Sequence, residues 1–193
     1  YLNTPETQLF NKSGILYGYH LAKMFIREKN KAILVEGQMD LILSHQSGIN
    51  NSIATSGTAF TELHAQAIKR FTSSVTICFD GDTAGVNAAL RASTIALGQG
   101  LEVKIAQLPD DTDPADLAVT QVEVYKKSLD GAISVVEFAL KIVLAKTNDS
   151  HDRGRLVVSD VLPYIKSITS SVEQSYFIRL VASRTLIREE SLW

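Results

Sequence analysis

Short apolar runs alternate with amphipathic segments through the first 110 residues or so, and this alternation restricts the fold more than any other feature of the sequence. Four runs have the composition of buried strands, at 32–35, 49–55, 74–79 and 101–108. Four segments with helical spacing lie before or between them, at 15–29, 39–47, 61–71 and 86–97, and Thr61 is the predicted N-cap of the third. Because strands that alternate with helices are joined by right-handed crossovers, we expect an α/β fold with a mostly parallel sheet flanked by helices.

The pattern changes after Pro114, where the spacing of apolar residues becomes entirely helical. Three or four helices fit residues 115–193, with breaks near Gly131, 147–153 and 169–171. We therefore expect a small all-α helical subdomain packed on the α/β core. The first residue is Tyr1 rather than Met, and we interpret the chain as a piece of a longer protein.

Charge is unevenly distributed along the chain. The net charge of −2 argues against a general nucleic-acid-binding protein, because phosphate contacts need clustered Lys and Arg. Residues 32–130, however, contain six basic residues against twelve acidic ones. No apolar run approaches the roughly 18 residues of a membrane span, and no leader opens the chain, so no membrane role is expected. Cys78 is the only cysteine and is predicted to be inert core.

The excess carboxylates follow the predicted strands. Glu36 ends the first strand, and Asp80 and Asp82 end the third. A further group follows the fourth strand, at Asp110, Asp111, Asp113 and Asp116. The carboxyl ends of parallel strands share one edge of a sheet, where ligands bind. Crowded carboxylates raise one another's pKa unless cations neutralise them, and Mg²⁺ prefers oxygen ligands while leaving positions for phosphates. The pattern thus favours metal-assisted phosphoryl transfer.

Each acidic segment also has a simpler interpretation. Asp-Gly-Asp is a common turn, Glu36 is compatible with a solvated strand end, and Asp116 suits the first turn of a helix. A non-enzymatic interaction module with an acidic patch for a basic partner remains a third hypothesis, which metal dependence would separate from the others. The metal hypothesis depends on all three segments occurring together.

Two motifs resemble the acidic motifs of the Toprim domain, namely VEGQMD at 35–40 and FDGDTAG at 79–85. Flanking segments resemble bacterial DnaG-type primases in order and spacing: YLNTPET at 1–7, FNK at 10–12, LYG at 16–18, TSGTA at 55–59 and LPD at 108–110 with Asp113-Pro114. The resemblance covers residues 1–118 and extends more weakly, through Pro163 and Ile165, into the helical tail.

The resemblance implies roles for individual residues. Glu36 would bind metal or assist deprotonation of the attacking 3′-hydroxyl, and Asp80, Asp82 and Asp113 would hold Mg²⁺ or Mn²⁺. Asp40 and Asp116 would lie behind the direct ligands. Asn3 and Lys12 would lie in the basic groove near the nucleotide and template, although an ordinary solvated role for Lys12 is the alternative.

The resemblance also implies a function and a division of the chain. The expected parts are the end of a preceding subdomain with a connecting helix (1–31), the Toprim metal-binding core (32–118) and a helical subdomain (119–193). The protein would be a DNA primase, a DNA-directed RNA polymerase that makes short RNA primers for replication from ribonucleoside triphosphates on a single-stranded DNA template. This chain alone would be weakly active or inactive. A Toprim nuclease or repair-associated DNA-binding module is the alternative.

The primase hypothesis further predicts partners outside this sequence. Zinc would bind only an N-terminal domain, and a C-terminal domain would contact the replicative helicase of the primosome, in the bacterial cytoplasm at the replication fork. Two departures from the family are visible: Ala115 stands where a second Asp is frequent, and Thr83 where an Arg or Lys is frequent. The four histidines show no metal-ligand spacing, and we assign them no role.

Overall fold

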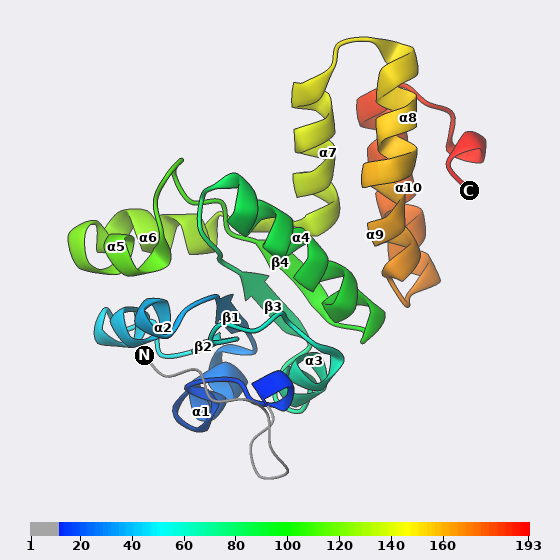
Figure 1. Ribbon diagram of the computed structural model, residues 1–193. Helices are drawn as coiled ribbons and strands as arrows, with labels where there is room; N and C mark the ends of the chain where they lie inside the picture. The colour runs from blue at the N-terminus through cyan, green and yellow to red at the C-terminus, as the bar shows by residue number, and fades with distance from the viewer. Residues whose placement is uncertain (1–11) are drawn as a thin grey trace.

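A five-stranded sheet with the order β2-β1-β3-β4-β5 forms the centre of the structure, a computed structural model that describes residues 12–193 (Figure 1). Its strands are β1 (Ala32–Val35), β2 (Ser52–Ala54), β3 (Ser74–Ile77), β4 (Glu102–Ile105) and β5 (Ile133–Ser134). The first four run parallel, which confirms the predicted α/β fold with a mostly parallel sheet. The chain moves from β1 outward to β2 and then crosses back to β3, so the direction of winding reverses between β1 and β3.

Helices bury both faces of the sheet. Side chains of β1 alternate between two hydrophobic clusters, with Ala32 and Leu34 in one and Ile33 and Val35 in the other. The first cluster includes residues of α1 (Tyr19–Lys29), α3 (Glu62–Lys69), α4 (Thr83–Gly98) and α7 (Val135–Lys146), and it continues into the helices that follow α7. The second includes residues of α2 (Gln38–Gln46), α5 (Pro114–Thr120) and α6 (Val122–Asp130). Burial on both faces explains why β1 has four consecutive apolar residues and no polar alternation.

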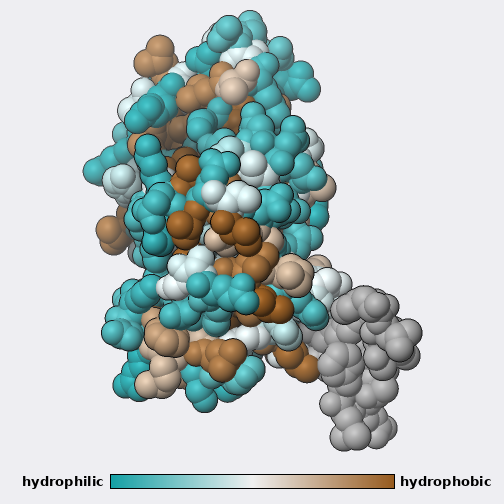
Figure 2. All heavy atoms as spheres, turned by 90° about the vertical axis from the view of Figure 1, so that its left-hand side faces the viewer, coloured by the Kyte–Doolittle hydropathy of each residue, from teal (hydrophilic) through white to brown (hydrophobic). Residues whose placement is uncertain are grey.

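Figure 2 views the side on which α2, α5 and α6 lie, where hydrophilic residues cover most of the surface and hydrophobic side chains show between them. The remaining helices, α8 (Ser150–Asp160), α9 (Leu162–Ser167) and α10 (Ser171–Thr185), stand beside α7 at the upper right of Figure 1. Short 3-10 helices at Lys12–Gly14 and Glu189–Ser191 complete the described chain. No described helix combines the length and the hydrophobicity that crossing a membrane requires.

Capping residues decide where several helices begin. The predicted N-cap Thr61 is confirmed, since its hydroxyl accepts a hydrogen bond from the N–H of His64 at 3.3 Å. α4 begins at Thr83, earlier than predicted, because the Asp82 carboxylate caps its first turn. α1 begins later than predicted: Gly18 takes a left-handed conformation (φ 76°), and Tyr17 just before it pairs with Ala54 in an isolated bridge.

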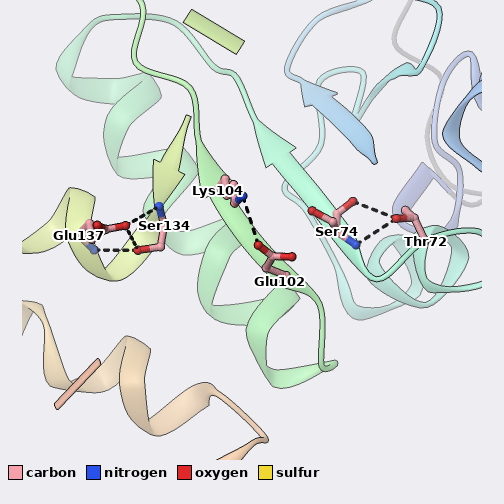
Figure 3. Close-up of polar contacts among 6 residues, drawn as sticks. All are labelled: Thr72, Ser74, Glu102, Lys104, Ser134 and Glu137. Atoms are coloured by element: carbon pink, nitrogen blue, oxygen red, sulfur yellow. Dashed lines mark hydrogen bonds and ion pairs between the residues drawn. The ribbon is translucent and has the colours of Figure 1, made fainter. Parts of the chain in front are cut away.

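The expectation of a purely helical region after Pro114 was wrong. Ile133–Ser134 forms β5, which pairs antiparallel with Lys104 and Ile105 at the edge of the sheet. Ser134 then caps α7, and its hydroxyl and N–H both contact the Glu137 carboxylate (Figure 3). In the same view Lys104 pairs with Glu102 along β4, and the Thr72 hydroxyl accepts from the N–H of Ser74 at the start of β3. Six helices, instead of three or four, follow Pro114 in the described chain.

The two-residue strand β5 depends on its pairing with β4 more than on its own sequence. A prediction from the spacing of apolar residues could therefore not find it. The additional helix boundaries fall at Gln121, between α5 and α6, and at Val161, just before Pro163 in the first turn of α9. The predicted breaks near Gly131, 147–153 and 169–171 do separate helices in the structure. Cys78 is free and fully buried, as predicted.

Candidate metal site at the carboxyl edge of the sheet

Four carboxylates surround the point where the winding of the sheet reverses, beyond the carboxyl ends of β1, β3 and β4. Glu36 follows β1, Asp80 and Asp82 follow β3, and Asp113 lies in the loop after β4. Open α/β sheets bind ligands at this position, because the strand-to-helix loops diverge there. Burial raises the pKa of Asp80 to about 6, and the charges of Asp40, Glu36, Asp113 and Asp82 contribute in the same direction. The acids that the sequence placed at separate strand ends therefore act electrostatically as one group.

The loop after β2 fixes the position of Glu36. The N–H of Ser56 and the hydroxyl of Thr55 both donate to the Glu36 carbonyl, at 3.0 and 3.3 Å. The Gln38 amide donates to the Ser56 hydroxyl at 2.7 Å. Burial, followed by the charges of Asp40 and Asp82, raises the pKa of Glu36, whereas the guanidinium of Arg91 lowers it. The backbone of Glu36 is thus anchored, while the residue remains exposed at the edge of the sheet.

Asp82 and Asp113 occupy equivalent positions at helix N-termini. One oxygen of Asp82 accepts from the N–H of Gly85 at 2.7 Å, and one oxygen of Asp113 accepts from the N–H of Asp116 at 2.6 Å. The helix dipole and these hydrogen bonds stabilise each negative charge. Each carboxylate still has a second oxygen, so capping a helix and binding a cation are compatible.

Two glycines of the second acidic motif allow close backbone packing around Asp80. The N–H of Gly81 donates to the Thr112 carbonyl at 2.9 Å, and a Cβ at Gly81 would lie 2.5 Å from the Pro109 carbonyl oxygen. A Cβ at Gly85 would collide with the backbone of Asp80. The close approach of the two loops therefore requires glycine at position 81, and the packing of the first turn of α4 on Asp80 requires glycine at position 85. These two contacts explain the positions of both glycines in the FDGDTAG motif.

Asp40 has a more specific environment than the sequence indicated, although its place behind the metal ligands stays a prediction. It is buried (8% exposed), and its carboxylate accepts hydrogen bonds from the N–H of Gly37, at 2.8 Å, and from the N–H of Ala115. Burial nevertheless raises the pKa of Asp40. A single carboxylate thus connects the loop that contains Glu36 with the first turn of the helix that Asp113 caps. Sequence analysis did not foresee the role of the Ala115 backbone, which no side-chain pattern encodes.

A polar layer that the sequence analysis missed lies beneath Asp40. The hydroxyls of Ser44 on α2 and Tyr125 on α6 are 2.9 Å apart, and both side chains are fully buried. Cys78 lies in the same hydrophobic cluster as Tyr125, and burial raises the pKa of its thiol. This layer joins α6 to α2 under the acidic loops. An isolated Tyr in an amphipathic helix carries no sequence signal for such a role.

The other predicted site residues are less informative. Asp116 is exposed and lies one turn into α5, where only its N–H contacts Asp113. Asn3 lies outside the described residues, and so does the side chain of Lys12. Their predicted contacts with nucleotide and template stay predictions.

Within the described part of the chain, three potential metal ligands lie within 4.8 Å of one another only at Asp149, His151 and Asp152. All three are exposed, at the start of α8, and Asp149 already caps that helix. The four carboxylates of the sheet edge are more widely spaced than this. Their oxygens suit a hard divalent cation that is held by one or two carboxylates at a time and keeps several waters.

Comparisons with known proteins identify the same region. Residues 33–118 match the family model described as Toprim-like. The DNA primase of Halalkalibacterium halodurans is 33% identical over 195 residues, covering 100% of this chain and 33% of that protein. The DNA primase of Geobacillus stearothermophilus is 38% identical over 184 residues, covering 94% of this chain and 31% of that protein. The chain thus spans about a third of the length of the curated relatives it matches.

Solved structures show the same similarity in three dimensions. A DnaG primase catalytic domain bound to single-stranded DNA superposes with a TM-score of 0.83 at 30% identity, covering 98% of this chain and 62% of that one. The likeness extends over the sheet and the helices after it. It is therefore not confined to the acidic motifs.

Proposed function

Because the chain belongs to the bacterial DnaG-type primase family, of which it is the Toprim-containing part, we propose that it carries the metal-binding core of a DNA-directed RNA polymerase that synthesises short RNA primers. In this proposal 32–118 form the Toprim core, 1–31 are the end of a preceding subdomain with its connecting helix, and 119–193 are the helical subdomain. The observation that supports it most is the electrostatic coupling of Asp80 with Glu36, Asp82 and Asp113 at the carboxyl edge.

Divalent metal use is implied by the family, and we propose Mg²⁺ or Mn²⁺ as the ion. The donor set fits, since it consists of carboxylate oxygens whose mutual repulsion a cation would relieve. Asp80 and Asp82 would hold it together with Glu36 or Asp113. When bound, the metal would neutralise phosphate charge in nucleotidyl transfer.

Individual side chains of the site would have different roles in the reaction. At neutral pH Asp80, with a pKa of about 6, is mostly ionised and available as a ligand. Glu36, anchored through its backbone and exposed, would bind metal or accept the proton of an attacking 3′-hydroxyl. Asp40 would keep Glu36 and Asp113 at a fixed separation by holding the N–H groups of Gly37 and Ala115.

Substrates and partners follow from the same proposal. The template would be single-stranded DNA, in line with the similar DnaG domain that was solved with it, and the substrates ribonucleoside triphosphates. The helicase contact and the zinc site would belong to other parts of a longer polypeptide, in the cytoplasm. The nuclease alternative has no observation in its favour, because the similar proteins described above are all primases.

The test is Asp80→Asn in the full-length protein, with primer synthesis on single-stranded DNA as the measurement. Asn has nearly the same size but lacks the charge that a hard cation requires, so synthesis should fall by about 10²-fold or more. Asp116→Asn is the matched control, because this exposed aspartate lies in the first turn of α5, after the neighbouring acidic loop. It should cost at most about 1 kcal/mol of stability and little activity.

Folding must be measured alongside. Asp80→Asn removes repulsion in the metal-free protein, and the melting temperature should hold or rise. If the variant instead unfolds while its remaining folded fraction synthesises primers at the normal rate, Asp80 is structural and the metal assignment fails.

A further inference from the structure

A polar hollow of about 360 Å³ lies between α4 and the helices of the tail. Asn87, Arg91 and Thr94, spaced by helical periodicity on one face of α4, form one wall. Lys146 of α7, Asp160 at the end of α8 and Tyr164 of α9 form the opposite wall. The hollow therefore combines two cationic side chains with hydroxyl and amide donors, which is the chemistry of an anion site.

Arg91 carries a charge that no residue lining this hollow neutralises. Within the described part of the chain its guanidinium has no hydrogen bond or ion pair, its charge lowers the pKa of Glu36, and the side chain is exposed. Lys146, by contrast, lies 3.4 Å from the carboxylate of Asp160, which neutralises it. An Arg that is free, exposed and beside a concave surface suits a phosphate, because its planar fork of donors matches the phosphate oxygens.

The hollow is close to the candidate metal site and distinct from it. A neighbouring cavity of about 250 Å³ is lined by Asp80, Gly81 and Val86, and it shares Ile142 of α7 with the polar hollow. Nine residues of α4 separate Asp82 from Arg91, which is about 13 Å at 1.5 Å per residue. A stacked single strand, at about 3.4 Å per nucleotide, covers that distance in roughly four nucleotides.

We propose that the hollow between α4 and α7–α9 binds a backbone phosphate of a single-stranded nucleic acid whose continuation passes the carboxyl edge of the sheet, with Arg91 as the principal contact. The proposal builds on the proposed function and adds a contact on the face of α4 that α7, α8 and α9 approach. Tyr164 is half buried in the same hollow and presents an apolar ring beside the phosphate position, which is the combination that sequence-independent single-strand binding uses.

The test measures binding of a short fluorescent oligodeoxythymidylate to the full-length protein by anisotropy at increasing salt. Arg91→Ala should weaken binding roughly 5- to 10-fold at low salt and reduce the salt slope by about 0.7, the value for one lost phosphate contact on a single strand. Arg91→Lys should recover part of the affinity. Arg155→Ala is the matched control, because Arg155 is also an exposed arginine, on α8, but lines neither hollow. It should bind as the unmodified protein does.

Asp160→Asn supplies a test in the opposite direction. It frees Lys146, so affinity should increase, and it removes a negative charge from the C-terminal end of α8, so stability should hold. Affinity and salt slope unchanged in both Arg91→Ala and Asp160→Asn would overturn the proposal. So would a raised KM for ribonucleoside triphosphates in Arg91→Ala with unaltered oligonucleotide affinity, since the hollow would then hold a free nucleotide.

The two proposals fail separately. If Asp80→Asn abolishes primer synthesis while Arg91→Ala binds the oligonucleotide normally, only the strand contact is wrong. If Arg91→Ala loses oligonucleotide affinity while Asp80→Asn leaves synthesis intact, the metal assignment is wrong and the phosphate contact stands.

Discussion

At the scale of single residues, Asp40 combines a buried charge with two backbone hydrogen bonds. Asp40→Ala would leave the N–H groups of Gly37 and Ala115 without their acceptor, at a cost of about 1–3 kcal/mol in the free energy of unfolding. The loops of Glu36 and Asp113 would also lose their connection, so the affinity for Mn²⁺ should fall in parallel. Urea unfolding and Mn²⁺ relaxation measure the two effects.

Asp130→Ala is the appropriate control, because Asp130 is an exposed aspartate at the end of α6. It should change stability by less than about 0.5 kcal/mol. Asp40→Asn keeps one acceptor oxygen and should lie between the alanine variant and the unmodified protein. An alanine variant as stable and as metal-competent as the original would show that Asp40 does not position the ligands.

At the scale of elements, the start of α4 depends on Gly85, which packs directly on the backbone of Asp80. Gly85→Ala should displace Asp80, weaken metal binding and lower the free energy of unfolding by about 1–3 kcal/mol, the usual cost of overpacking. Gly154→Ala is the matched control within α8, where a Cβ meets nothing within 4 Å. It should instead stabilise the protein by about 0.5–1 kcal/mol. Thermal unfolding of the two variants side by side tests the difference, and equal effects would contradict the packing argument.

At the scale of the whole molecule, stability should depend on both pH and metal. The folded-state pKa of Asp80, about 6, is above its ordinary value of 3.8, so its contribution to stability is complete below pH 3.8 and is lost as pH rises toward 6. Without metal, the unmodified protein should therefore lose about 1 kcal/mol relative to Asp80→Asn between pH 4 and pH 7, a figure discounted for solvent screening.

Millimolar Mn²⁺ at pH 7 should remove this difference in stability between the unmodified protein and Asp80→Asn, because the cation stabilises the ionised carboxylate. Chelation of the Mn²⁺ with EDTA should restore the difference. Urea unfolding across the pH range, with and without Mn²⁺, provides the measurement. A constant difference between the two proteins at every pH would mean that Asp80 does not carry the raised pKa.

Several features followed from the sequence alone because they are local. The apolar run at 32–35 and the β-branched run from Ser74 encode strands without reference to the rest of the chain, and Thr61 encodes a cap. Glu36, Asp80, Asp82 and Asp113 could be assigned to one sheet edge because parallel strands place their carboxyl ends together. Their identification as metal ligands remains a prediction.

The tertiary structure alone decided what depends on distant parts of the chain. β5 exists because the edge of β4 offers hydrogen bonds to Ile133, and Asp40 bridges two loops because α2 packs against α5. In the sequence Arg91 is an ordinary cation on a helix, and only the packing of α7, α8 and α9 places it in a hollow. Helix and strand periods specify which side of an element is buried. They do not specify which element will cover it, because that choice depends on the packing of all the others.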